Sequence, residues 1–314
     1  MAEITASMVK DLREKTGVGM MDCKAALAAT GGNMDAAVDW LRAKGLAKAA
    51  KKSARVAAEG LIGLAVEATT GALVEVNSET DFVARNAKFQ SMVAEIARLA
   101  LKAQGDVEKL KAMGFPRSSQ TVADHVAEMI ATIGENMTVR RTAALSVGHG
   151  VIGSYMHNQA APNLGKIGVL VALESTGSKD ELSQFGRMLA MQIAATNPVA
   201  LDLAAAPPET LAREKAILEE KNAGKPASVL AKIVASGLKS YAKENCLLEQ
   251  AYVHDSSKTV TQAIADAQSK AGAPIKLTAY VRMQLGEGLD KKGDDFAAEV
   301  AKAGGKPDGG PANA

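Results

Sequence analysis

The sequence of 314 residues predicts an α+β protein. Apolar residues repeat at helical spacing up to about residue 45, and beyond Ala57 they alternate as they do in β-strands. A strand pattern followed by a helical pattern then occurs twice, at 61–102 and at 167–190. We therefore expect a helical start and a duplicated core of small antiparallel sheets covered by helices.

The first 45 residues contain three short apolar stripes separated by glycines, which predict three helices around a small core. Asp22 and Asn33 are placed to cap the second and third helices, because their side-chain oxygens accept bonds from free N–H groups. The arrangement resembles a ubiquitin-associated three-helix bundle. Met20 and Met21 are adjacent and cannot both face so small a core, so one of them is expected to be offered to a partner.

A basic segment follows at 42–55, with six Lys or Arg residues, no acid and mostly Ala between them. It predicts a linker helix between the bundle and the rest of the chain. A solvated connection is the preferred interpretation. An RNA-binding strip is the alternative, but the segment lacks the interleaved aromatic residues that would favour it.

The first repeat predicts strands at 61–67 and 73–76, joined by a turn at 69–72, and a helix at 89–102. Between strand and helix lie Thr80, Asp81, Phe82 and Val83. The second repeat has a short Ser/Thr/Gly segment after its strand and nothing that corresponds to these four residues. We interpret them as an addition for function rather than for folding.

The remaining segments predict two helices at 209–221 and 228–244, which form a projecting hairpin at about 208–244, and strands at 247–253 and 277–285. Four units are predicted. Residues 1–55 form a three-helix bundle with its basic linker, and 56–150 form a first core sub-domain with the four-residue tip. Residues 151–289 form a second core sub-domain with the hairpin, and 290–314 form a C-terminal module with a disordered tail.

Charge and composition exclude several classes of protein. Lys and Arg number 37 and Asp and Glu 35, and the net charge of +2 gives no overall field that would attract nucleic acid. Cys23 and Cys246 form no CxxC pair, which favours a reducing, cytoplasmic setting. The sequence begins without a signal-peptide pattern, and no apolar run approaches the roughly 18 residues of a membrane span.

Motifs for catalysis are missing from the sequence. There is no GxxxxGK[ST], HExxH or GxSxG pattern and no Cys/His cluster with metal-ligand spacing. The four histidines each stand alone, and an isolated histidine is more often structural than catalytic. We therefore expect no enzyme, no catalytic residue, no metal site and no cofactor.

Phe82 allows two interpretations. It precedes Phe89 by seven residues, so one unbroken helix would place both side chains on the same face and bury Phe82 in the core. Arg85 and Asn86 could instead interrupt the helix and leave the first turn free, with Thr80 as its cap and Asp81 near its positive end. Periodicity alone does not decide between them.

Several motifs in the chain resemble those of one known family. In order, they are GVGMMDCKAAL, WLRAKG, VNSETDFVARNAKFQ, IGENMTVRR, GSYMH, KIGVLVALE and GEGLDKKGDDFAAEV. Together they resemble bacterial elongation factor Ts. The resemblance implies a guanine-nucleotide exchange factor of translation elongation, which binds elongation factor Tu with GDP and promotes GDP release so that GTP can bind.

The same resemblance implies the partners of the protein. They are the GDP-bound and nucleotide-free forms of elongation factor Tu, without direct contact to nucleic acid or to a membrane. It leaves a homodimer and a 2:2 complex with elongation factor Tu both open.

The resemblance also implies roles for single residues. Thr80, Asp81, Phe82 and Val83 are implied to bind the partner and to dislocate its Mg²⁺, with Phe82 as a wedge between helices of the partner's GTPase domain. Asp81 and Phe82 carry most of this expectation.

Further implied contacts lie far from this tip. Met20 and Met21 are implied to share a pocket with Val234 and to grip a helix of the GTPase domain. His157 and the segment 295–300 are implied to reach the partner as well.

The chain departs from the best-known members at two places. The segment 158–166 is longer than the usual connection after the equivalent of His157. Gln192 stands where a histidine is familiar, so no role of that histidine is carried over.

Overall fold

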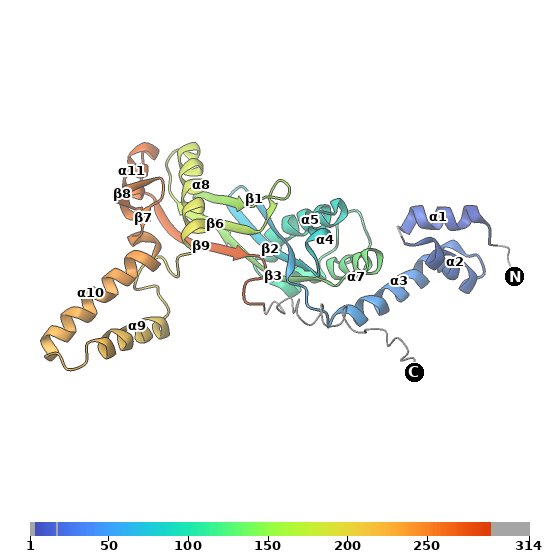
Figure 1. Cartoon of the computed structure of the whole chain (residues 1–314). Coiled ribbons are helices and arrows are strands. Elements are labelled where there is room, and N and C mark those ends of the chain that lie inside the picture. Colours follow the sequence, from blue (N-terminus) through green and yellow to red (C-terminus); the bar gives the residue numbers. More distant parts are fainter. Residues whose placement is uncertain (1–3, 17, 290–314) are drawn as a thin grey trace, which may run out of the picture.

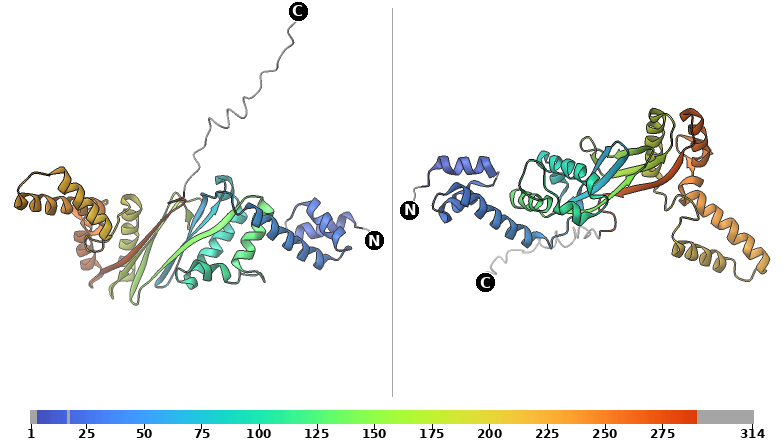
Figure 2. Two further views of the ribbon diagram at one scale, coloured as in Figure 1. Left: turned by 90° about the horizontal axis from the view of Figure 1, so that it is seen from below. Right: turned by 180° about the vertical axis from the view of Figure 1, so that it is seen from behind.

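The protein is described by a computed structural model that covers residues 4–16 and 18–289. The molecule is elongated, with a small helical bundle at one end, a helical hairpin at the other and two β-sheets between them (Figures 1 and 2). The predicted segment 290–314 lies outside the described residues.

Three helices form the N-terminal bundle: α1 (Ala6–Thr16), α2 (Met20–Ala29) and α3 (Met34–Lys52). Asn33 caps α3 as predicted, since its side chain accepts a 3.0 Å bond from the Ala36 N–H. The prediction for Asp22 is wrong. Helix α2 already begins at Met20, so Asp22 lies within its first turn and forms an ion pair with Lys44 at 3.2 Å.

The predicted linker helix is confirmed as the second half of α3, which runs without a break from the bundle to the core. It packs against α7 (Val122–Ile133), where Gly45 lies close enough that an added Cβ would be 3.2 Å from Cβ of Ala131. Arg42 pairs with Asp124 on α7 at 3.1 Å. Part of the basic segment is thus engaged within the protein.

The first sheet has the strand order β3-β2-β1-β5. Its strands are β1 (Glu59–Glu67), β2 (Thr70–Ser78), β3 (Met137–Ser146) and β5 (Leu164–Gly165). The predicted hairpin is confirmed, although β2 starts at Thr70 because the turn is tighter than expected and uses Ala68 at a φ of 51°. Between β2 and β3 come α4 (Asp81–Ala84), α5 (Ala87–Ala103), α6 (Val107–Ala112) and α7.

The second sheet has the strand order β4-β6-β9. Its strands are β4 (Gly150–His157), β6 (Ile167–Glu174) and β9 (Lys276–Gln284). Helix α8 (Lys179–Thr196) follows β6 directly, and α11 (Val260–Ala271) lies beside it. The strand predicted at 247–253 is wrong in large part: it is a 3₁₀ helix, η1 (Leu247–Glu249), and a two-residue strand, β7 (Ala251–Tyr252), paired with β8 (Asp255–Thr259).

Apart from the added strand β5 in the first, the two sheets have the same topology. In each, a hairpin is followed by a long helix, and a later strand then pairs with the second strand of the hairpin. The first strand of each hairpin also has a glycine near its start, Gly60 on β1 and Gly150 on β4, with φ of 123° and 126°. A Cβ on either glycine would strike a carbonyl oxygen of the neighbouring strand. This shared course agrees with the repeat that the sequence predicts.

The sheets pack face to face, and helices cover their outer faces. The core between the sheets contains Ile62 and Leu73 from the first and Ile152, Leu170 and Met283 from the second. Each sheet also has one core of its own, which lies between the sheet and the helices that cover it. Because both faces of the central strands are covered, those strands are apolar in nearly continuous runs rather than in strict alternation.

A buried carboxylate ties the chain after β9 to the first sheet. Glu75 on β2 accepts bonds from Arg140 at 3.0 Å, Arg141 at 2.5 Å, the Asn77 amide at 3.0 Å and the Gly286 N–H at 2.9 Å. Burial alone would raise the pKa of Glu75, but these bonds outweigh burial and lower the pKa below its ordinary value. The carboxylate is therefore ionised and holds the two sheets together at this edge.

The predicted hairpin is confirmed as α9 (Pro208–Lys221) and α10 (Ala227–Asn245), which project from the second sheet (Figure 1). The long segment 158–166 also has a place in the fold. It carries β5 across to the first sheet, where Leu164 and Gly165 pair with β1. None of the described helices combines the length and the apolar character that a membrane crossing requires.

Candidate partner-binding surface

Phe82 lies on the surface in a short, separate helix. Helix α4 ends at Ala84, and Asn86 caps the next helix by accepting bonds from the Lys88 and Phe89 N–H groups at 2.9 and 3.3 Å. Phe82 is therefore 74% exposed, whereas Phe89 is fully buried. Of the two interpretations that the sequence allows, the interrupted helix is the one observed.

The other residues of the predicted tip have different surroundings. Asp81 is half-buried and forms an ion pair with Arg85 at 2.8 Å, across one turn of α4. Val83 is 4% exposed and belongs to the core under the first sheet. Val83 thus anchors the turn, and the contact with a partner that the resemblance implies for it stays a prediction.

Thr80 occupies the cap position of α4, but its side chain makes no cap bond. Instead its hydroxyl donates to the carboxylate of Glu135 at 2.8 Å, and its N–H donates to the same carboxylate at 3.0 Å. Thr80 thus has the predicted cap position but not the predicted cap bond, because its side chain is directed toward Glu135 in the loop between α7 and β3. Glu135 lies in the motif IGENMTVRR, but no local pattern connects it with Thr80.

Glu79 is hydrogen-bonded to the segment that carries Glu135. The Glu79 carboxylate accepts from the Asn136 N–H at 2.5 Å and pairs with Arg55 at 3.5 Å. Asn136 is buried and donates through its side chain to the Arg55 carbonyl at 2.7 Å. The loop that supports Thr80 is thus fixed both to the tip and to the end of the basic segment.

Met20 and Met21 form a second exposed apolar site, 53% and 79% exposed, at the start of α2. Val234 does not join them. It is 8% exposed and lies on α10, and α2 and α10 are at opposite ends of the molecule (Figures 1 and 2). The resemblance implies a pocket shared by these three residues; they lie apart in the single chain, and the shared pocket stays a prediction.

His157 is exposed at the end of β4. Its Nδ1 lies 3.1 Å from the Tyr155 hydroxyl, and the Arg187 guanidinium lies 5.9 Å from the centre of the Tyr155 ring. The longer connection after His157 turns toward the first sheet and leaves the ring accessible. The segment 295–300 lies outside the described residues.

Gln192 is fully buried and takes part in a hydrogen-bond network. Its amide nitrogen donates to Gln250 at 3.1 Å and to the Ala251 carbonyl at 3.2 Å, and its oxygen accepts from the Val253 N–H at 2.7 Å. These bonds satisfy the side chain and give it a structural role between α8 and β7.

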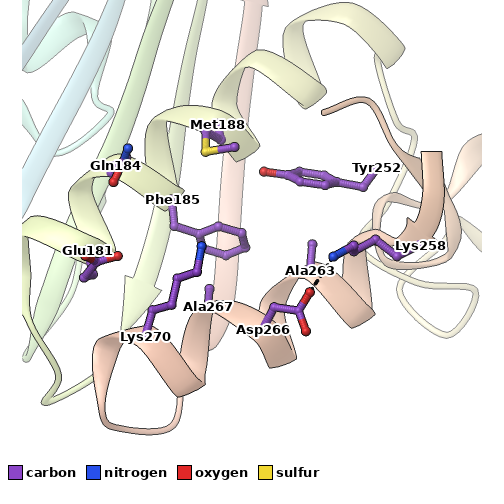
Figure 3. Close-up of a pocket in the computed structure, with 10 residues that line it drawn as sticks. All are labelled: Glu181, Gln184, Phe185, Met188, Tyr252, Lys258, Ala263, Asp266, Ala267 and Lys270. Atoms are coloured by element: carbon purple, nitrogen blue, oxygen red, sulfur yellow. Dashed lines mark hydrogen bonds and ion pairs between the residues drawn. The ribbon is translucent and has the colours of Figure 1, made fainter. Parts of the chain in front are cut away.

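A hollow of about 260 Å³ lies between α8 and α11 (Figure 3). Phe185 and Met188 form its apolar wall, and Lys258 at its edge is paired with Asp266 at 2.7 Å. It contains none of the residues singled out by the sequence. Within residues 4–16 and 18–289, no group of three or more His, Cys, Asp or Glu could hold a metal ion.

Comparison with known proteins identifies the family. The model of the family described as Elongation factor TS matches residues 79–287. The chain is 63% identical over 304 residues to the elongation factor Ts of Methylobacterium sp. (strain 4-46), over 96% of this chain and 99% of that relative. The chain belongs to the elongation factor Ts family. Its members are translation elongation factors with a nucleotide-exchange function.

Two further relatives are similar over nearly the whole chain. The elongation factor Ts of Rhodopseudomonas palustris (strain BisB5) is 60% identical over 309 residues, which is 98% of this chain and all of that relative. That of Xanthobacter autotrophicus (strain ATCC BAA-1158 / Py2) is 58% identical over 306 residues, with the same coverage. The matched residues begin at Glu79, directly before the tip, and end at Glu287, which pairs with Arg141 at 3.3 Å.

Proposed function

We propose that this protein is the guanine-nucleotide exchange factor for elongation factor Tu. It binds elongation factor Tu with GDP, disturbs the Mg²⁺ and phosphate site, and thereby promotes GDP release so that GTP can bind. The exposure of Phe82 is the observation that carries this proposal. A phenylalanine that is 74% exposed can bury its ring in a partner, and aromatic side chains buried in this way are typical hot spots of interfaces.

The surroundings of Phe82 suit a wedge. Its turn is held below by the buried side chains of Val83 and Ala84, and beside it by the bonds from Thr80 to Glu135. An aromatic side chain on a fixed turn loses little conformational freedom when it enters a partner. Binding free energy can therefore be used to move the partner's helices.

The partner's bound ion is sensitive to such movement. Mg²⁺ requires near-ideal octahedral geometry and is held by few protein ligands, so a small shift of the surrounding helices weakens its binding. Without the ion, the GDP phosphates are poorly neutralised and GDP dissociates more easily. By linkage, bound GDP weakens the affinity of the exchange factor by the same factor.

The magnitudes are compatible with one dominant side chain. A tenfold loss of nucleotide affinity corresponds to about 1.4 kcal/mol. A buried aromatic hot spot in an interface contributes about 2 to 4 kcal/mol. Phe82 could thus supply a large part of the coupling, with Asp81 as its polar neighbour.

Other exposed residues support a wider interface. We propose that Met20 and Met21, which resemble the flexible apolar contacts of adaptable binding surfaces, grip a helix of the GTPase domain. His157 would contact the same partner from β4. The proposal leaves out Val234, which is buried. The ubiquitin-associated likeness of the bundle and a cytoplasmic location are part of the same proposal.

The function needs no chemistry of its own, so the protein is proposed to act as a binding protein rather than as an enzyme. The RNA-binding alternative gains no support from the basic segment. Arg42, Lys44, Lys52 and Arg55 all bond to protein groups.

Release of a fluorescent GDP analogue from elongation factor Tu tests the proposal. The labelled complex is mixed with excess unlabelled GDP, with and without the whole protein. We expect the intact protein to accelerate release and Phe82→Ala to lose most of the acceleration. If the intact protein gives no acceleration, the proposed function is wrong. If the intact protein accelerates release and Phe82→Ala accelerates it equally, the role of Phe82 as a wedge is wrong.

A further inference from the structure

The direction of the Phe82 side chain depends on a very short piece of backbone. Helix α4 has four residues, and the N–H groups of Arg85 and Asn86 close it by bonding to the Phe82 and Val83 carbonyls at 3.2 and 2.9 Å. So short a helix is not stable by itself. Support from other parts of the chain must therefore fix the turn that presents Phe82.

That support reaches the N-terminal side of α4 from a distant segment. Glu135 lies 55 residues beyond Thr80 and accepts three contacts from it, one from the N–H and two from the hydroxyl, at 2.8 to 3.1 Å. The acceptor is a carboxylate, and hydrogen bonds to an ionised acceptor are stronger than neutral ones. Ser78 adds a bond to the Thr80 carbonyl at 2.9 Å. Thr80 is thus held at its N–H, its hydroxyl and its carbonyl.

The segment that carries Glu135 is fixed in turn. Lys52, at the end of α3, donates to the Gly134 carbonyl, and Asn136 is held by Glu79 and by the Arg55 carbonyl. Glu135 therefore stands between two anchored neighbours. A carboxylate supported in this way can hold Thr80 in one position rather than follow its movement.

We propose that Glu135 is a positioning residue for nucleotide exchange: its carboxylate holds Thr80 and thereby sets the direction in which Phe82 projects. The proposal rests on the proposed exchange function and adds a residue from outside the tip. Glu135 acts through Thr80 and the α4 backbone and need not touch the partner.

The position of these bonds separates positioning from general stability. The C-terminal side of α4 keeps its own support without Glu135, because Ala84 is buried, its carbonyl accepts from Gln90 at 3.0 Å, and Asn86 caps α5. Loss of Glu135 should therefore loosen the N-terminal side of the turn while the sheet and α5 remain. Phe82 would then sample several directions, and fewer encounters would insert it.

A double-mutant cycle on GDP release from elongation factor Tu tests this. The four proteins are the wild type, Glu135→Ala, Phe82→Ala and the double variant. We expect Glu135→Ala to reduce the acceleration about tenfold when Phe82 is present, the effect of about one charge-assisted bond. In the Phe82→Ala protein, the same substitution should leave the residual acceleration unchanged.

Equal losses in both backgrounds would overturn the proposal, because Glu135 would then act independently of Phe82. A Glu135→Ala protein with wild-type exchange would overturn it as well. Either result would leave the exchange function standing, provided that the wild type accelerates release and Phe82→Ala does not. If the wild type gives no acceleration, the exchange function fails and the positioning role fails with it.

Two further comparisons guard against a folding defect. Glu128→Ala removes from α7 a carboxylate that accepts a 2.8 Å bond from the Gln120 amide and does not contact Thr80, and we expect this variant to exchange as the wild type does. Thr80→Val keeps the shape of the side chain but removes the hydroxyl, whereas Thr80→Ser retains it. Less acceleration by Thr80→Val than by Thr80→Ser supports the proposal. Equal acceleration overturns the part of it that the hydroxyl bonds carry, since Thr80→Val keeps the N–H bond to Glu135.

Discussion

Phe82 and Phe89 are seven residues apart and have opposite surroundings: Phe82 is 74% exposed, and Phe89 is fully buried under the first sheet. Two residues at this spacing share one face of a continuous helix. The difference arises because α4 ends at Ala84 and a new helix starts at Ala87, with Asn86 as its cap. The break lets one aromatic build the core while the other faces outward.

The ion pair between Asp81 and Arg85 should contribute little to stability. Arg85 is largely exposed, and exposed pairs at this spacing stabilise a helix by about 0.3 to 0.5 kcal/mol. We expect Arg85→Ala to lower the free energy of unfolding by no more than this amount, as measured by urea unfolding. A loss above about 1 kcal/mol would show that the pair supports more than its own turn.

Protonation of Glu75 should lower the free energy of unfolding at acidic pH. The pKa of Glu75 is lowered in the folded state, so its contribution is present above the ordinary value of 4.5 and is lost as the pH falls below it. Glu75→Gln should cost about 2 to 3 kcal/mol near neutral pH, because it leaves Arg140 and Arg141 without their carboxylate.

Urea unfolding of the wild type and Glu75→Gln over a range of pH measures this contribution. The difference between the two proteins should be constant near neutral pH and should shrink below the ordinary pKa of 4.5. A difference that does not change with pH would contradict an ionised Glu75 in the ion cluster.

His125 should also make the free energy of unfolding depend on pH, but in a higher pH range than Glu75. Its ring stacks on Phe115 with centroids 3.8 Å apart, and burial lowers the pKa of His125 although the charge of Glu128 opposes the shift. The unfolded chain then binds more protons than the folded one as the pH falls through 6.5, so stability declines there. His125→Phe keeps an aromatic stack and should reduce this decline, as followed by urea unfolding. The same decline in both proteins would contradict the assignment.

Much of the fold could be predicted from local pattern. The N-terminal helices, the first hairpin, β6 and the projecting hairpin each have a clear period or a clear turn signal. The short strand β7 and the helix η1 could not be assigned correctly, because their chain direction is set by contacts such as the bond from Gln192 to Ala251. A local pattern does not contain such tertiary contacts.

The site could be predicted in part for the same reason. Asn86 has the sequence position of a helix cap, so an exposed Phe82 was one of two consistent interpretations. Glu135 was not predicted, because its bond to Thr80 joins residues 55 positions apart. The burial of Val83 and Val234 likewise depends on packing between elements that the sequence does not place relative to one another.

The central claim is that Phe82 drives nucleotide release. Its most direct test is the rate constant of labelled GDP release from elongation factor Tu at saturating concentrations of the factor, because saturation separates release from binding. The proteins to compare are the wild type, Phe82→Ala and Val253→Ala. Val253 is a matched control, since it is apolar and 49% exposed but lies outside the proposed interface.

We predict that Phe82→Ala lowers this rate constant at least tenfold, as expected for loss of an aromatic hot spot worth about 2 kcal/mol or more. Val253→Ala should release GDP at the wild-type rate. A Phe82→Ala protein that also releases GDP at the wild-type rate would contradict the account.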